Sequence, residues 1–207
     1  GLDDSLLNDV PDQSVGLKLR LGCAGFMLSV GRLNTRKNLQ MTIEAALDAK
    51  CLSNEFPLVI VGAPDGKQDP QSPRALQAIT QGLIRYTGHV TDAELVWLYR
   101  HAHLFVFMSL DEGFGLPPIE AEYFGTPVVV SDLPVFRENL SGSAQFVPPG
   151  DRQMLSTILA DLAGHGRADA ASIQRGTTAH SWTKTVTMMR SEFETGLQVR
   201  SRESRKH

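Results

Sequence analysis

The sequence holds 207 residues, of which 42% are hydrophobic and 21% charged, a composition that suits one ordinary globular core. The formal net charge of -3 argues against a nucleic-acid-binding protein, which needs an excess of Lys and Arg to neutralise phosphates. No apolar run approaches the roughly 18 residues of a membrane helix and no signal-peptide pattern is present, so we expect a cytoplasmic location. Because the chain begins at Gly1 rather than Met, we also expect it to be part of a longer protein.

Short apolar runs alternate along the chain with segments whose apolar residues recur at helical spacing. The apolar runs predict six strands, at 26–30, 57–61, 84–87, 103–108, 127–130 and 145–147. The intervening helices are predicted at 38–51, at 73–82, from an N-cap at Asp92 onward, at 117–124 and at 151–163. This alternation predicts an α/β fold with a doubly wound, Rossmann-like parallel sheet of about six strands and a C-terminal helical extension.

Unusual residues cluster directly after the predicted strands. They are Gly31, Gly62, Gly88, the stretch 109–115 and the pair 131–132. In parallel sheets, ligands bind outside the carboxyl ends of the strands. All of these residues are therefore expected at one edge of the sheet, which is the predicted site.

The loop after the first strand, residues 31–38, holds three cations just before a helix, namely Arg32, Arg36 and Lys37. Backbone N–H groups and the positive end of the helix dipole favour an anion there, and a guanidinium with an ammonium can neutralise a diphosphate. The alternative is a solvated basic turn in which Asn38 acts only as a helix cap.

The segment after the fourth strand, residues 112–120, contains two glycines and a proline between two carboxylates. The glycines allow close approach of the backbone to a ligand, and Pro117 suits the first helical position. Glu120 is then expected in the first turn, where its carboxylate can accept two hydrogen bonds from a ribose diol. Glu112, nearer the centre of the edge, is placed to contact sugar hydroxyls or positive charge at a reacting carbon. The alternative is a chance pair of Glu residues at a helix start.

The glycine after the third strand, Gly88, allows backbone groups to reach a flat base, with His89 or Val90 covering the face of the base. The alternative for His89 is a solvent-facing loop residue. The other histidines show no spacing typical of a metal site or a catalytic triad. Cys23 and Cys51 also lack metal-ligand spacing, so we predict reduced cysteines and no metal site.

Taken together, these segments resemble the C-terminal, donor-binding domain of the group 1 retaining glycosyltransferases with the two-Rossmann B-type fold. The resemblance runs over about residues 25–165 and rests on the segments 31–38, 61–62, 87–90, 112–120 and 125–128. Each segment is common on its own, whereas their order and spacing in one chain are specific.

The resemblance implies roles for individual residues. Arg32 and Lys37 contact the donor diphosphate, Glu120 the ribose and Glu112 the transferred sugar. Arg32, Lys37 and Glu112 are thus the expected catalytic residues. The further substrate-binding residues are backbone contacts to phosphate, sugar and base at Gly31, Gly62, His89, Val90, Gly113, Phe114, Gly115 and Leu116. The family also implies retention of anomeric configuration, no metal or other cofactor, and an acceptor bound by another domain.

We therefore expect the donor half of a hexosyltransferase that moves a sugar from a nucleotide-diphosphate donor to a saccharide or lipid-linked acceptor. The arginine, the lysine and the helix N-termini would stabilise the departing diphosphate during a front-face displacement without a side-chain nucleophile. GDP-mannose is slightly favoured over a UDP-sugar, because the surroundings of 36–38 and 88–90 resemble bacterial mannosyltransferases. The fragment alone is expected to bind nucleotide and transfer little.

Around the predicted nucleotide-binding domain at 23–166 we expect three further segments. Residues 1–22 are interpreted as an interdomain linker, and 167–199 as helices that contact a missing N-terminal domain. The basic tail at 200–207 is compatible with a peripheral contact at the inner face of a membrane.

Two other functions share the predicted sheet. A dinucleotide-binding oxidoreductase is disfavoured because Gly-x-Gly-x-x-Gly is missing after the first strand and no acidic residue ends the second. A non-catalytic module that binds a nucleotide or docks a partner stays open, because the same sheet edge would serve it.

Overall fold

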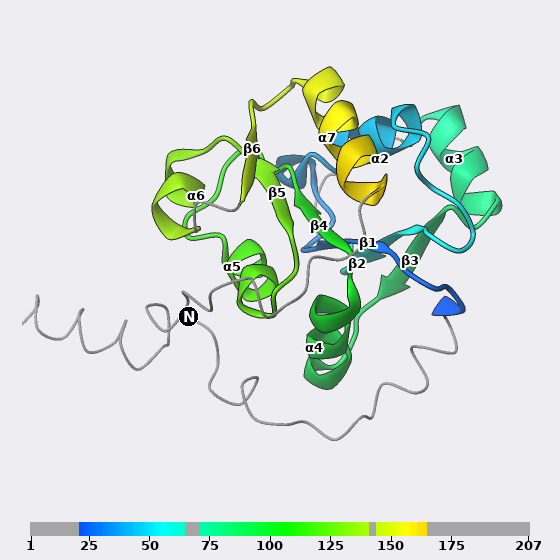
Figure 1. Ribbon diagram of the computed structural model, residues 1–207, viewed down its shortest axis with the longest axis horizontal. Coiled ribbons are helices and arrows are strands. Elements are labelled where there is room, and N and C mark those ends of the chain that lie inside the picture. Colours follow the sequence, from blue (N-terminus) through cyan, green and yellow to red (C-terminus); the bar gives the residue numbers. More distant parts are fainter. Residues whose placement is uncertain (1–20, 65–70, 141–143, 165–207) are drawn as a thin grey trace, which may run out of the picture.

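The computed structural model describes residues 21–64, 71–140 and 144–164. Within these ranges, six parallel strands form one sheet in the order β3-β2-β1-β4-β5-β6 (Figure 1). The strands are β1 (Met27–Val30), β2 (Leu58–Val61), β3 (Ile84–Gly88), β4 (Leu104–Phe107), β5 (Val128–Ser131) and β6 (Gln145–Val147). The predicted doubly wound parallel sheet is confirmed.

Helices cover both faces of this sheet. They are the 3-10 helix η2 (Thr35–Lys37) and the α-helices α2 (Leu39–Asp48), α3 (Pro73–Thr80), α4 (Asp92–His101), α5 (Leu116–Tyr123), α6 (Pro134–Asn139) and α7 (Arg152–Gly164). In Figure 1, α2, α3 and α7 lie together above the sheet, whereas α4 and α5 lie below it. The described part of the chain is therefore a sandwich of helix, sheet and helix.

Each strand supplies side chains to two separate hydrophobic cores. In β2, for example, Leu58 and Ile60 belong to the core under α2, α3 and α7, whereas Val59 and Val61 belong to the core that includes residues of α4 and α5. Successive side chains of a strand point to opposite faces, so a strand buried on both faces must be apolar throughout. This explains why the strands are continuous apolar runs in the sequence.

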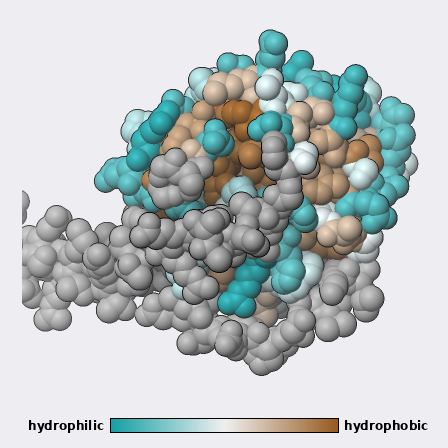
Figure 2. Space-filling view, in the orientation of Figure 1, coloured by the Kyte–Doolittle hydropathy of each residue, from teal (hydrophilic) through white to brown (hydrophobic). Residues whose placement is uncertain are grey.

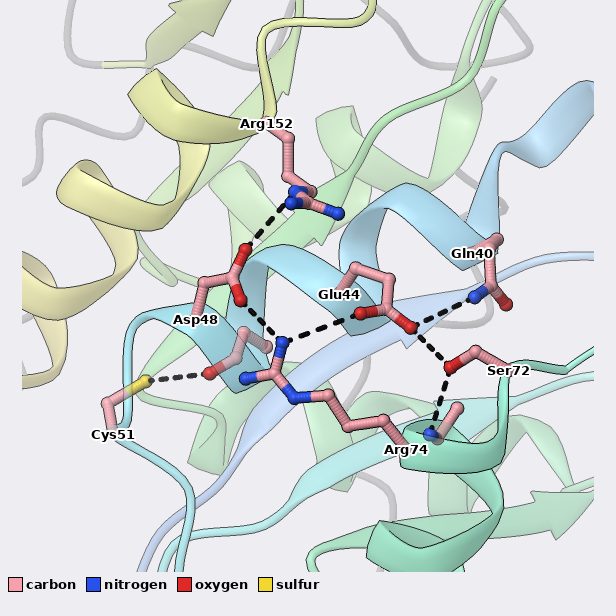
Figure 3. Close-up of polar contacts among 9 residues, drawn as sticks. Gln40, Glu44, Asp48, Cys51, Ser72, Arg74 and Arg152 are labelled. Atoms are coloured by element: carbon pink, nitrogen blue, oxygen red, sulfur yellow. Dashed lines mark hydrogen bonds and ion pairs between the residues drawn. The ribbon is translucent and has the colours of Figure 1, made fainter.

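A polar network joins the three helices above the sheet (Figure 3). Asp48 of α2 pairs with Arg74 of α3 at 2.5 Å and with Arg152 of α7 at 3.1 Å. Glu44, one turn earlier in α2, accepts hydrogen bonds from Ser72 at 2.5 Å and Gln40 at 3.1 Å. Through Asp48 the network connects α2 to both α3 and α7.

The order of the strands reverses between β1 and β4. From β1 the chain moves outward through β2 to β3, and it then returns to β4 on the other side of β1. Loops that leave the two central strands therefore run in opposite directions, which opens a crevice at the carboxyl edge of the sheet. Backbone atoms also join these loops: Arg36 O accepts a hydrogen bond from Leu110 N at 2.8 Å, and Ser109 Oγ lies 3.1 Å from the same carbonyl oxygen.

Beyond the sheet edge, the loops after the first three strands continue side by side. Gly31 N donates to Val61 O at 3.0 Å, and Gly62 N donates to Gly88 O at 3.0 Å. A Cβ atom added to Gly62 would lie 1.9 Å from Gly31 O, so the two backbones touch at this point. Gly62, predicted as a ligand contact, thus also has a structural role.

Two local predictions were wrong. Thr91 rather than Asp92 caps α4, in a reciprocal arrangement in which its hydroxyl accepts from Glu94 N while the Glu94 carboxylate accepts from Thr91 N. This capping box was readable from Thr and Glu three residues apart. The predicted helices also leave out residues 134–139, which form α6; this helix begins at Pro134 and buries Phe136 completely.

Several sequence-based expectations fall outside the described residues. They concern the helices at 167–199, the basic tail at 200–207 and most of the linker at 1–22. Of the linker, only Leu21 and Gly22 are described, and Leu21 is buried in the core that includes residues of α4 and α5.

The contact between Gly62 and Gly31 predicts that Gly62→Ala destabilises the fold. Its φ of +144° disfavours a side chain, and the new methyl group would also displace a backbone carbonyl. Gly88→Ala is the matched control, because its φ is +71° but nothing lies within 4 Å of the added Cβ. We expect the control to cost about 1–2 kcal/mol and Gly62→Ala a further ~1–3 kcal/mol, measured by urea unfolding. Equal losses would contradict a tight backbone contact.

Candidate functional site

An ion pair connects the loops after β1 and β4, which flank the crevice. Lys37 Nζ lies 2.5 Å from Glu112 Oε1, and the two side chains are only 15% and 9% exposed. Ser109 Oγ donates to the same carboxylate oxygen at 2.7 Å, and Lys37 Nζ lies 4.6 Å from the centre of the Phe107 ring. Both charges therefore have partners in a site with little water. Two of the predicted catalytic residues, 75 positions apart in the sequence, are in direct contact.

A small pocket lies next to this pair. Its lining includes Gly31, Arg32 and Lys37 from the loop after β1, together with Phe107 at the end of β4. Gly31 lies under the lysine side chain, since a Cβ added there would be 3.4 Å from Lys37 Cε. Arg32, the other predicted diphosphate contact, is exposed. The structure thus brings Arg32, Lys37 and Glu112 to one end of the crevice.

The start of α2 follows this cationic loop directly. Asn38 occupies the N-cap position with a left-handed φ of +49°, and its side chain makes no capping hydrogen bond. The alternative interpretation of this loop was that Asn38 acts only as a helix cap. Its side chain does not act as a cap. A helix start without a side-chain cap retains backbone donors that suit an anion.

The glycine-rich loop before α5 is held in place by α6. Gly115 is the N-cap of α5 at a φ of +76°, and a Cβ added there would lie 2.2 Å from the Phe136 ring. Asn139 Nδ2 donates to Phe114 O at 3.1 Å. Because Pro117 and Pro118 have no N–H group, the backbone donors at this helix start come from residues 113–116. These are the residues predicted to line phosphate and sugar.

Glu120 lies further along its helix than predicted. The helix α5 begins at Leu116, one residue before Pro117, and its first turn holds no acidic residue. Glu120 Oε2 accepts a hydrogen bond from Tyr99 Oη of α4 at 3.0 Å. Burial raises the pKa of the Glu120 carboxyl, an effect that the hydrogen bond from Tyr99 partly offsets. The expected first-turn position was wrong, because Pro117 was taken as the first residue of the helix rather than the second.

The two residues predicted to cover a base differ in exposure. His89 is exposed after β3, whereas Val90 is buried and packs in the core below the sheet. Only the backbone of Val90 can therefore face a ligand at this edge.

Sequence reasoning missed three residues that support the site. Tyr99 of α4 and the α6 residues Phe136 and Asn139 were not among the predicted site residues. The predicted edge residue Asp132 is bound by Arg137, whose Nε lies 2.7 Å from Asp132 Oδ1. This bond lowers the pKa of Asp132, and both residues lie at the surface.

Several large apolar side chains are exposed on the described surface. Figure 2 shows hydrophilic residues around the rim of the described surface and a brown, apolar area near its upper centre. The large exposed apolar side chains are Leu76, Tyr86, Leu110, Phe114 and Met154. Two of them, Leu110 and Phe114, belong to the loop after β4 that carries Glu112.

Among the described residues, no group of three or more His, Cys, Asp or Glu side chains could hold a metal ion. In the same ranges, every helix is too short or too polar to cross a membrane. Metal independence stays a prediction.

Comparison with known proteins now identifies the family. The family model described as Glycosyl transferases group 1 matches residues 24–172. This chain belongs to the group 1 glycosyltransferases. The resemblance inferred from the sequence is confirmed.

Curated relatives of this chain include several bacterial enzymes. The O-antigen chain mannosyltransferase RfbU of Salmonella typhimurium is 34% identical over 138 residues, which cover 66% of this chain and 38% of the relative. The serotype-specific mannosyltransferase WbdA of Escherichia coli is 30% identical over 168 residues, which cover 75% of this chain and 21% of the relative. The chain thus spans well under half the length of either relative.

A solved structure shows the same fold. The crystal structure of Anabaena Alr3699/HepE in complex with UDP and glucose matches with a TM-score of 0.69 and 23% identity, covering 96% of this chain and 55% of that one. At this identity the likeness establishes the fold alone, which is that of the B-type glycosyltransferases.

The buried ion pair predicts strong coupling between its partners. Lys37→Met leaves the Glu112 carboxylate without its cation, and we expect a loss of about 3 kcal/mol in the free energy of unfolding. Adding Glu112→Gln should recover part of this loss, with a coupling energy of about 1–3 kcal/mol in a double-mutant cycle. The measurement is urea unfolding of the four variants.

The control cycle uses Arg74→Met and Asp48→Asn. This pair has the same 2.5 Å separation, but its side chains are 48% and 31% exposed. We expect a coupling energy below about 1 kcal/mol there. If the two cycles gave the same coupling, the ion pair in the crevice would be no more than a surface contact.

Proposed function

We propose that this chain is the donor-binding part of a retaining glycosyltransferase and holds a nucleotide-diphosphate sugar in the crevice between the loops after β1 and β4. The observation that carries the proposal is the contact between Lys37 and Glu112 at the point where the strand order reverses. It places a cation for phosphate and a carboxylate for sugar hydroxyls next to each other, at the edge where such sheets bind ligands.

Each part of the donor has a partner in this proposal. Lys37 and Arg32 neutralise the diphosphate, and the amides of residues 113–116 donate hydrogen bonds to phosphate and sugar oxygens. Glu120 accepts from the ribose hydroxyls, while the backbone at 88–90 lies beside the base. The loop glycines keep the backbone accessible along this path.

The chemistry is a displacement on one face of the sugar. The bond between the anomeric carbon and the diphosphate oxygen breaks, and the diphosphate leaves with the bonding electrons. The acceptor hydroxyl oxygen attacks from the same side and forms the new bond to the anomeric carbon, while the hydroxyl proton passes to the departing diphosphate oxygen. Lys37 and Arg32 stabilise the growing charge on the leaving group, which is where preorganised cations act most strongly. Glu112 faces the sugar and the positive charge that develops on it.

The relatives guide the choice of donor. The two named above are mannosyltransferases, which supports a mannosyl donor, with GDP-mannose as the first candidate. The Anabaena structure contains UDP and glucose, which supports a UDP-sugar as the second. The acceptor, a saccharide or a lipid-linked saccharide, would bind outside this chain, because the chain spans well under half of each relative.

A calorimetric titration of the chain with UDP, GDP and ADP tests the binding role. One base should bind clearly more tightly than the others, and Glu120→Ala should weaken that binding by about 1.5–3 kcal/mol, because it removes a charged hydrogen-bond acceptor. Glu55→Ala is the control, since Glu55 is an exposed carboxylate in the segment before β2 rather than after a strand. Unchanged affinity in Glu120→Ala would remove this residue from the proposed site.

A transfer assay tests the catalytic role. We expect this chain alone to bind donor and transfer little sugar, and a longer version that restores the upstream part of the natural protein to transfer it at a measurable rate. Radiolabelled GDP-mannose and UDP-glucose serve as donors, with Lys37→Met in the longer protein as the inactive control. Efficient transfer by this chain alone would contradict the proposed division of labour. Nucleotide binding without transfer in the longer protein would favour a non-catalytic binding module.

A further inference from the structure

Tyr99 is fully buried, and its hydroxyl group is hydrogen-bonded to Glu120. It is 1% exposed, and its ring packs against Phe105 and Phe124 with centroid distances of 5.8 and 6.0 Å. Its hydroxyl donates to Glu120 Oε2 at 3.0 Å. The bond joins α4 to α5 on the face of the sheet that these two helices cover.

Packing alone does not account for a tyrosine at this position. The ring lies among aromatic and aliphatic side chains, where phenylalanine would fill the same space. A buried hydroxyl without a partner costs free energy, so its presence is favourable only because Glu120 accepts from it. The role of the hydroxyl is therefore its hydrogen bond to Glu120.

The hydrogen bond also restricts what Glu120 can do. A glutamate side chain has three rotatable bonds, and contact with Tyr99 at one carboxylate oxygen holds the group in a single orientation. Burial raises the pKa of Glu120, whereas donation from Tyr99 lowers it, so the tyrosine favours the ionised carboxylate. An ionised carboxylate has about four acceptor positions, which leaves room for the two hydroxyls of a ribose.

We propose that Tyr99 is a positioning residue that orients Glu120 to accept hydrogen bonds from the ribose 2′- and 3′-hydroxyls of the donor. This inference rests on the proposed donor site. It assigns to the interior of α4 a role in recognising ribose, although Tyr99 itself contacts no substrate.

The test measures preference for ribose over 2′-deoxyribose. Wild-type chain and Tyr99→Phe are titrated with two pairs of probes, UDP with 2′-deoxy-UDP and GDP with 2′-deoxy-GDP, and the ratio of the two dissociation constants is compared for the base that binds. We expect Tyr99→Phe to reduce this ratio by about two- to tenfold, the range that a single hydrogen bond contributes. The ratio does not depend on the folded fraction of a variant, so partial unfolding leaves it unchanged.

Two further variants separate the possible failures. Glu120→Ala should abolish the preference for ribose. Tyr123→Phe is the control, because it removes a different tyrosine hydroxyl, one on α5, and should leave the preference at the wild-type value. If wild type shows the preference and Glu120→Ala loses it while Tyr99→Phe retains it, the role of Tyr99 is overturned and the donor site stands. If wild type shows no preference, or binds none of the probes, both the ribose contact and the inference from it are wrong.

Discussion

The contact between the loops after β1 and β4 is the feature on which the candidate site depends. These loops leave adjacent strands in opposite directions, so only side chains and a few backbone groups can join them across the crevice. The Lys37–Glu112 pair, with Ser109 donating to the same carboxylate oxygen, makes that connection. Because the ion pair has little exposure to water, separating it is costly, and the two loops are fixed relative to each other.

The supports of the site lie within the fold rather than in the loops themselves. Phe136 of α6 packs on Gly115, Tyr99 of α4 holds Glu120, and the touching backbones of Gly31 and Gly62 align the loops after β1 and β2. Each support works through a position that has no freedom to move, either a buried aromatic ring or a backbone contact. Sites placed on loops gain their geometry from such rigid neighbours.

The sequence predicted the sheet well because its strands are buried on both faces. Such strands must be apolar at every position, so a run such as Leu58–Val61 is conspicuous, and the glycine that follows it marks the sheet edge. The gathering of residues at one edge was predicted from the same pattern, whereas the family was recognised by a resemblance in the order and spacing of segments such as 31–38 and 112–120. The partners of individual side chains were harder to predict. Nothing in the spacing of Lys37 and Glu112 indicates that they pair. A tyrosine on the buried face of a helix gives no sign in the sequence that its hydroxyl has a role beyond packing of the ring. The six-residue helix α6 was missed because it is too short to show a period.

The pairing of Lys37 with Glu112 explains which contacts donor binding must change. Lys37 is already neutralised by Glu112, so a diphosphate that carries more than one negative charge needs either a second cation or the release of the carboxylate. Under the proposed function both occur: the exposed Arg32 adds charge from the same loop, and Glu112 exchanges the lysine for sugar hydroxyls. Binding then exchanges the partners of side chains that are already held in place. Less conformational entropy is lost than if flexible side chains had to be ordered around the donor.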